Sequence, residues 1–211
     1  MPLTRFERLQ PERRTALLEA AAEEFGRKGY ADASLNRILE RAGLSKGVAY
    51  YYFEDKEDLF LTVVRSYMDV LDVGFFTRLP ESITAESFWP SLAEVYRRAF
   101  VRSREIPWAF GVWRAAGELW RNNPTGALAA FADEWVGVVM RLFKRGQSLG
   151  VIRADLPDDL LLGWVRAVDD AHDRWVLSHW DELDAEALNA AADRMVDGLQ
   201  RLVGCRQGEM Q

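Results

Sequence analysis

Apolar residues along this chain recur at the three- and four-residue spacing of helical faces, and the alternation typical of a half-buried strand is nearly absent. Residues 12–28 show the pattern clearly, with an apolar face opposite most of the charged residues, Glu23 and Glu24 among them. The same spacing predicts about nine helices, at residues 12–28, 35–41, 46–52, 55–76, 84–104, 108–121, 125–148, 158–179 and 185–204. The sequence therefore predicts an all-α fold.

Residues that favour helix ends stand at the boundaries of these segments. Gly29 is expected to end the first helix, because glycine readily adopts the left-handed conformation that follows a helix. Ser34, Asp55 and Asp184 are expected to cap the helices after them, since their side-chain oxygens can accept free N–H groups of a first turn. Gly43 is expected to make the turn that ends the second helix.

The predicted helices fall into an N-terminal group of short helices and a later group of long ones. All eight tryptophans belong to the later part, after residue 88. We expect a head at residues 1–55 and a body at residues 56–211, with the helix at 56–76 linking the two. A chain of 211 residues is long enough for such a two-part molecule.

Composition is that of an ordinary soluble protein, with 49% apolar and 28% charged residues. A formal net charge of −6 argues against a protein that coats nucleic acid with its whole surface, but it is compatible with a local basic surface. The single cysteine, Cys205, excludes an internal disulfide and fits a reducing compartment. Because no segment has the apolar run of a signal peptide or a membrane span, we expect a cytoplasmic protein without membrane contact.

Residues 34–52 have the pattern of a helix-turn-helix, two short helices joined by a glycine-containing turn. The positions expected to face inward are apolar, apart from the hydroxyl tip of the last one: Ile38, Ala42, Leu44, Ala49 and Tyr52. No acidic residue lies between Arg41 and Phe53, so the segment carries no charge that would repel phosphate.

The outward face of the second helix in this pair offers groups suited to DNA. It consists of Ser45, Lys46, Gly47, Val48, Tyr50 and Tyr51. Free N–H groups at a helix start can bind phosphate, and tyrosine hydroxyls can donate to phosphate oxygens. Val48 could contact a thymine methyl group in the major groove. The plainer alternative is a helical corner with an aromatic rim, but the agreement of cap, turn and inward pattern favours DNA binding.

Residues 13–60 resemble the tetracycline-repressor (TetR) family of bacterial transcription regulators. The matching marks are A-x-x-x-F-x-x-x-G-Y at 21–30, the cap at Ser34, I-x-x-x-A-G-L-S-K-G at 38–47, Y-x-Y-F at 50–53 and K-E-x-L-F at 56–60. The resemblance implies a DNA-binding head, a linking helix, and a body that binds an effector and dimerises. It also implies a set of DNA-contacting residues: Ser34, Ser45, Lys46, Gly47, Val48, Tyr50, Tyr51 and Lys56. Val48 and Ala49 depart from the family, which usually has a polar residue and a leucine there.

A small-molecule pocket in the body is a further implication of the resemblance. The aromatic candidates to line it are Trp108, Phe110, Trp113, Trp120, Phe131, Trp135 and Trp164. Their abundance favours an apolar or aromatic effector, and ordinary core packing is the alternative. His172 and Asp169 lie on neighbouring faces of one helix, but their spacing brings together too few ligands for a metal. We expect no metal and no cofactor, only an unidentified small-molecule effector.

Apolar stripes on the last two helices are expected to pair with those of a second copy in a four-helix interface. The residues expected in this interface are Leu161, Val168, Trp175, Met195 and Leu199. Such a homodimer would present two heads to the two half-sites of a palindromic double-stranded operator.

The function expected from these features is that of a ligand-responsive DNA-binding regulator, a repressor that a small apolar or aromatic effector releases from its operator. The alternative is a helical small-molecule-binding protein or enzyme that keeps a vestigial DNA-binding head. The sequence has no G-x-S-x-G, H-E-x-x-H, P-loop or Rossmann motif, so we do not expect an enzyme.

Overall fold

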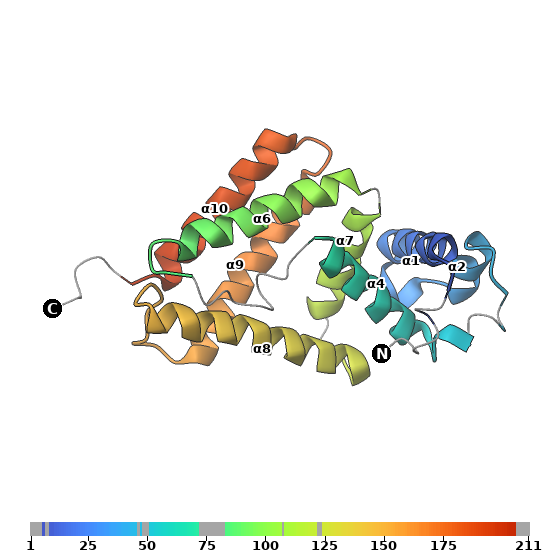
Figure 1. Cartoon of the computed structure of the whole chain (residues 1–211), viewed down its shortest axis with the longest axis horizontal. Helices are drawn as coiled ribbons and strands as arrows, with labels where there is room; N and C mark the ends of the chain where they lie inside the picture. The colour runs from blue at the N-terminus through green and yellow to red at the C-terminus, as the bar shows by residue number, and fades with distance from the viewer. Residues whose placement is uncertain are drawn as a thin grey trace. The chain divides into compact units, whose positions relative to one another are not determined.

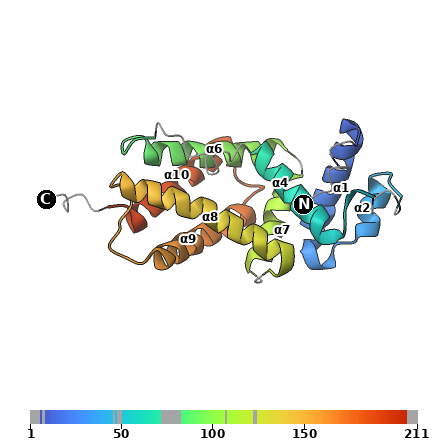
Figure 2. The ribbon, with the colours of Figure 1, turned by 60° about the horizontal axis from the view of Figure 1, so that its bottom comes forward.

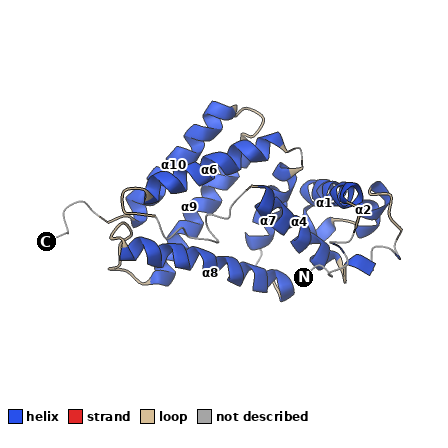
Figure 3. Ribbon diagram, viewed as in Figure 1, coloured by secondary structure: helices blue, strands red, loops and turns tan. Residues whose placement is uncertain are grey.

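In a computed structural model of the chain, the structure describes residues 6, 9–45, 47, 51–71, 83–106, 108–121 and 124–205. Helices dominate these residues, which form no strand beyond an isolated bridge between Ile152 and Gly204 (Figure 3). The helices, coloured in chain order in Figure 1, are α1 (Pro11–Asp32), α2 (Leu35–Arg41), α4 (Lys56–Val70), α6 (Phe88–Glu105), α7 (Ala109–Arg121), α8 (Gly126–Ser148), α9 (Asp158–Ser178) and α10 (Ala185–Val203). The all-α prediction is confirmed.

Most observed helices begin and end within a few residues of the predicted ones. In the predicted segment 46–52, Gly47, Tyr51 and Tyr52 are helical, and the other positions lie outside the described residues. The first helix differs from its prediction: Gly29 adopts φ 73° and ψ 172°, but helical bonding resumes and α1 continues to Asp32. Gly29 therefore breaks the helix without ending it, because a residue at positive φ interrupts the ladder only locally.

Short-range caps form where the structure describes them. The side-chain oxygens of Asp55 and Asp184 each accept the backbone N–H three residues later at 2.8 Å. Ser34 Oγ accepts the corresponding N–H at the start of α2 at 3.5 Å. Gly43 makes the expected turn with φ 66°. These contacts act within one helical turn, which is why local sequence predicts them.

The chain divides into two compact units that do not follow chain order. Unit 1 comprises Met1–Val70 with Ser103–Glu134, and unit 2 comprises Leu71–Arg102 with Trp135–Gln211. Unit 1 thus joins the predicted head to α4, α7 and the first part of α8. Within it, α2 lies beside α1 in both ribbon views (Figures 1 and 2).

Unit 1 has a closely packed core around α1. The Phe25 and Phe60 rings are fully buried and meet edge-on, with centroids 4.8 Å apart. α1 and α7 approach each other at two glycines: a Cβ added to Gly26 would lie 2.3 Å from the Cα of Gly111. Only glycine at this point lets the two backbones come so close.

Unit 2 has its own apolar core, with side chains from α6, α8, α9 and α10. Leu161, Met195 and Leu199, which were expected in a dimer interface, are buried in this core by their own chain. Val168 is partly buried against the same core, whereas Trp175 keeps 42% of its surface exposed. An apolar stripe shows that a helix face is buried, but it does not show whether the same chain or another one covers it.

Candidate nucleic-acid interface

A tight turn leads from α2 into the predicted DNA-reading segment. The backbone N–H groups of Gly43 and Leu44 donate to the carbonyls of Glu40 at 3.1 Å and Leu39 at 2.8 Å. Leu44 and the fully buried Ile38 anchor the turn to the core of unit 1. These two backbone hydrogen bonds satisfy carbonyl groups at the end of α2, and the chain turns abruptly there.

Residues after the turn differ in their exposure. Ser45 and Gly47 are exposed, and Tyr51 keeps 50% of its surface exposed. Tyr52 is partly buried and meets the Tyr51 ring edge-on at 5.1 Å, and Phe53 is buried. The neighbouring aromatic residues therefore face different surroundings, as expected. The remaining positions of the segment lie outside the described residues: Lys46, Val48, Ala49 and Tyr50.

Lys56, a predicted DNA contact, binds the chain itself at the connection between α1 and α2. Its Nζ donates to the carbonyl oxygens of Ala31 at 2.8 Å and Ala33 at 3.3 Å. It also lies 4.9 Å from the centroid of the Tyr30 ring, a distance suited to a cation–π contact. An ammonium group has three donors, so these bonds leave one for a phosphate.

Ser34, another predicted DNA contact, already takes part in two hydrogen bonds. Its Oγ accepts the Arg37 N–H, and its own N–H donates to Glu24 Oε1 at 3.2 Å. The hydroxyl proton takes part in neither bond, so it remains free to donate to a phosphate oxygen.

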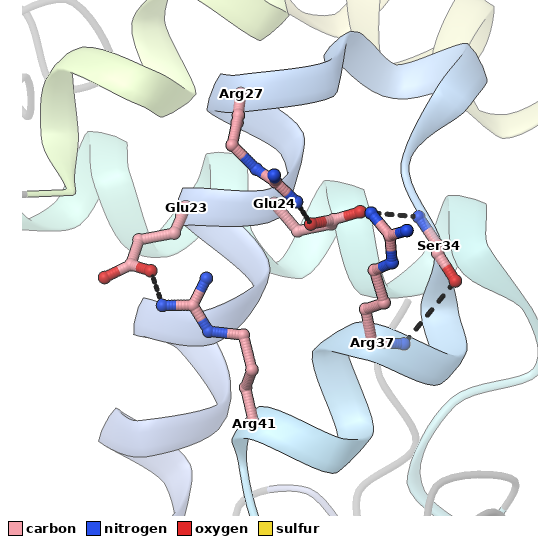
Figure 4. Close-up of polar contacts among 6 residues, drawn as sticks. All are labelled: Glu23, Glu24, Arg27, Ser34, Arg37 and Arg41. Carbon is pink, nitrogen blue, oxygen red and sulfur yellow. Dashed lines mark hydrogen bonds and ion pairs between the residues drawn. The ribbon is translucent and has the colours of Figure 1, made fainter.

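Sequence reasoning placed Glu24 on the polar face of α1, and the structure corrects this: the residue is fully buried. Burial raises the pKa of its carboxyl, but hydrogen bonds from Arg27 and the Ser34 N–H, with the charges of Arg27 and Arg37, outweigh burial and lower the pKa. The position seven residues after the buried Leu17 could have revealed the inward orientation, because residues seven apart share a helical face. Figure 4 shows this cluster of charges between α1 and α2.

The start of α4 also connects to α8 within unit 1. Glu57 Oε1 accepts the backbone N–H of Leu128 at 3.0 Å, in the first turns of α8. About two turns further along the same helix, Arg65 pairs with Glu134 at 3.0 Å and lies 4.6 Å from the centroid of the Phe131 ring. The neighbours Lys56 and Glu57 thus bind the α1–α2 connection and α8, respectively.

Aromatic candidates for an effector pocket are divided between the units. Unit 1 holds five of them: Trp108, Phe110, Trp113, Trp120 and Phe131. Unit 2 holds Trp135 and Trp164, and Trp164 packs against the core of that unit. In unit 1 the Trp120 and Phe131 rings stack with centroids 5.7 Å apart, and Trp108 lies edge-on to a tyrosine of α4 at 6.5 Å. These contacts pack the aromatic groups of unit 1 against α4, α7 and α8.

Unit 2 contains a polar cluster where α6, α9 and α10 meet. The Tyr96 hydroxyl donates to Asp169 Oδ1 at 3.0 Å, and burial raises the pKa of Asp169 to about 6. His172 Nε2 donates to the Ala191 carbonyl at 2.9 Å, its ring stacks on Phe100, and burial lowers its pKa. Among the described residues, no three His, Cys, Asp or Glu side chains are grouped so that they could hold a metal. In the same part of the chain, no helix is long and apolar enough to span a membrane.

Sequence comparison identifies relatives of this chain. The family model described as bacterial regulatory proteins of the tetR family matches residues 17–63. The HTH-type transcriptional repressor AcnR of Corynebacterium diphtheriae is 28% identical over 165 residues, which cover 75% of this chain and 77% of AcnR. The HTH-type transcriptional regulator RutR of Escherichia coli is 30% identical over 141 residues, which cover 64% of each chain.

Solved structures share the fold over most of the chain. The transcriptional regulator FadR of Bacillus subtilis, solved in complex with stearoyl-CoA, aligns with a TM-score of 0.66 and 19% identity, covering 90% of this chain and 98% of FadR. A tetR family transcription regulator from Shewanella sp. PV-4 aligns with a TM-score of 0.66 and 17% identity, covering 93% of this chain and 100% of its own. At such identities the likeness concerns the fold.

Proposed function

Because the chain belongs to the TetR family of bacterial regulatory proteins, we propose that it is a ligand-responsive repressor that binds a palindromic double-stranded operator as a homodimer. The observation that carries the proposal is the helix-turn-helix, with its closed turn at Gly43 and the exposed residues Ser45, Gly47 and Tyr51 beyond it. A regulator of this kind acts in the cytoplasm, where the bacterial chromosome lies.

The proposed head, residues 1–55, holds most of the DNA-contacting residues. They are Ser34, Ser45, Lys46, Gly47, Val48, Tyr50 and Tyr51, with Lys56 at the start of the body. The hydroxyl groups and the two lysines would donate to phosphates and fix the position of the head on the duplex. Val48 would read a base edge, because an apolar side chain in the major groove can distinguish thymine by its methyl group.

The proposed body, residues 56–211, would bind the effector and the second copy of the chain. Trp175 of α9 keeps 42% of its surface exposed, and this large apolar side chain supports a surface that another chain covers. FadR was solved with a long-chain acyl-CoA, and the aromatic residues of unit 1 support an apolar or aromatic effector here as well. Binding would favour the DNA-free state if the effector prefers that state.

Selection from a pool of random duplexes tests DNA binding without knowledge of the operator. We expect the wild-type chain to enrich one palindromic sequence and to bind it with strong salt dependence. Lys46→Ala should weaken binding to all duplexes and reduce the salt slope by about one. Lys144→Ala is the matched control, because that lysine pairs with Asp158 in unit 2. A wild-type chain that enriches no sequence would contradict the proposal.

Thermal unfolding with stearoyl-CoA and with indole tests the effector class. A compound that binds the folded chain raises the melting temperature by mass action. The same compound should release the selected duplex in a gel shift, and sedimentation of the free chain should give the mass of a dimer. Melting and duplex binding unchanged by both compounds would count against an apolar or aromatic effector.

A further inference from the structure

Two neighbouring carboxylates of α1 reach opposite ends of α2 (Figure 4). Glu24 Oε1 accepts the N–H of Ser34, the residue that caps the start of α2, at 3.2 Å. Glu23 forms an ion pair with Arg41, the last residue of α2. The first helix of the helix-turn-helix is therefore tied to α1 at both ends.

The bond at the start of α2 replaces one that this helix cannot make for itself. In a capping box, the side chain of the third helical residue accepts the N–H of the cap residue. The third residue of α2 is Arg37, whose guanidinium group has donors only. Glu24, ten residues before Ser34 in the chain, supplies the missing acceptor, while Ser34 Oγ accepts the Arg37 N–H in the usual way.

The two carboxylates differ in how far they are buried. Glu24 is fully buried, and Arg27 donates to its other oxygen at 2.7 Å. Glu23 and Arg41 have side chains that are 52% and 49% exposed, so water and salt screen their attraction. Removing the Glu24 acceptor would leave the part-buried Ser34 N–H without its partner, which costs more than losing an exposed pair.

We propose that Glu24 is a positioning residue for DNA binding: without touching DNA, it fixes the start of α2, and with it the turn and the DNA-reading segment, relative to α1. The inference rests on the proposed function. Base readout requires side chains placed to within hydrogen-bonding distance, whereas attraction to phosphates tolerates small displacements. Loss of the acceptor should therefore reduce sequence-specific binding more than general affinity for DNA.

The test compares the full-length chain on the duplex that the wild type selects and on an unrelated duplex of equal length, at a temperature where circular dichroism shows each variant folded. Glu24→Ala should lower the ratio of the two affinities by about tenfold, the effect of leaving one part-buried donor unsatisfied. Glu24→Gln keeps an acceptor oxygen and should stay within about threefold of the wild type. Glu23→Ala is the control for an exposed pair and should stay within about twofold.

Each outcome decides the inference. A folded Glu24→Ala variant with an unchanged ratio, or a Glu24→Gln variant that falls as far as Glu24→Ala, would overturn it while DNA binding by the wild type still stands. If Glu24→Ala does not fold, Glu24→Leu fills the same space without an acceptor. Amide hydrogen exchange gives an independent check, because a Ser34 N–H that exchanges like an exposed amide in the wild type would overturn the contact itself. A wild type that selects no duplex would remove the proposed function and the inference together.

Discussion

Each unit has a carboxyl group with a shifted pKa, and the two shifts have opposite directions. Glu24 in unit 1 is fully buried, and burial raises its pKa, yet donation by Arg27 and the Ser34 N–H outweighs burial and leaves the pKa below its ordinary value. In unit 2, burial raises the pKa of Asp169 to about 6 against the hydrogen bond from the neutral Tyr96 hydroxyl. A carboxyl that accepts from a cation therefore stays ionised more easily than a carboxyl whose hydrogen bond comes from a neutral hydroxyl.

Gly26 in unit 1 lies at a close contact that Gly163 and Gly198 in unit 2 do not share. In unit 1, Gly26 and Gly111 let α1 and α7 meet at backbone distance. In unit 2, a Cβ added to Gly163 of α9 or Gly198 of α10 would meet no atom within 4 Å. A close backbone contact and a buried ion thus help to hold unit 1 together. Unit 2 is held mainly by the apolar side chains of its core.

The largest expected effect is that of adding a side chain at the glycine contact in unit 1. Gly26→Ala should lower the free energy of unfolding by about 3 kcal/mol, because its Cβ meets backbone atoms that cannot turn aside. Gly163→Ala is the control in unit 2 and should raise the free energy by roughly 0.5–1 kcal/mol through reduced freedom of the unfolded chain. Urea denaturation of both variants measures the difference, and equal effects would contradict the contrast.

Removing the charge of the buried carboxylate comes next. Glu24→Gln should destabilise the chain by about 1–2 kcal/mol at pH 7, because the bond from Arg27 loses its charged acceptor. A lowered pKa stabilises the fold above the unfolded-state pKa, and this contribution disappears as pH falls through the lower folded-state value. The variant and the wild type should therefore converge in denaturation experiments at acid pH; a gap that persists there would contradict this account.

Asp169→Asn should have the opposite sign. Because the folded-state pKa of Asp169 is about 6 and the unfolded value is lower, ionisation costs stability above pH 6, and the cost vanishes as pH falls toward the unfolded value. The variant should be more stable than the wild type by on the order of 1 kcal/mol at pH 8 and indistinguishable from it near pH 4. Denaturation of both proteins across this range measures the effect, and destabilisation at pH 8 would refute it.

The smallest effect is expected at the exposed ion pair of the head. Glu23→Gln should change the free energy of unfolding by less than about 0.5 kcal/mol, and added salt should abolish the difference, because water screens the pair with Arg41. The same denaturation experiment in low and high salt measures it. A cost equal to that of Glu24→Gln would mean that burial does not distinguish the two carboxylates.

Sequence predicted the features of this molecule that depend on near neighbours. The caps at Ser34, Asp55 and Asp184 and the turn at Gly43 depend on residues within one turn, so the chain encodes them locally. The helix-turn-helix followed from the same short-range pattern. Gly29 shows the limit, since α1 continues to Asp32 although Gly29 has a non-helical φ of 73°.

Partners far apart in the chain escaped sequence reasoning. Glu24 looked like part of a polar face because its acceptor role depends on Ser34 and on the packing around α1. The hydrogen bonds from Lys56 to the carbonyls of Ala31 and Ala33 were not predicted, because nothing local shows that these groups lie beside it. The burial of Leu161 and Met195 by their own chain was not predicted, because periodicity does not say which chain covers a helix.

By itself, the sequence determined the helical class, the helix-turn-helix pattern and the resemblance to the TetR family, because periodicity, caps and turn residues act over a few positions. Only the tertiary structure decided that the head shares a compact unit with α7 and the start of α8, and that Glu24 is buried. The physical reason is that both results depend on which distant surfaces meet. The close approach at Gly26 and Gly111 and the acceptor offered to Ser34 exist only after α1, α2 and α7 have packed.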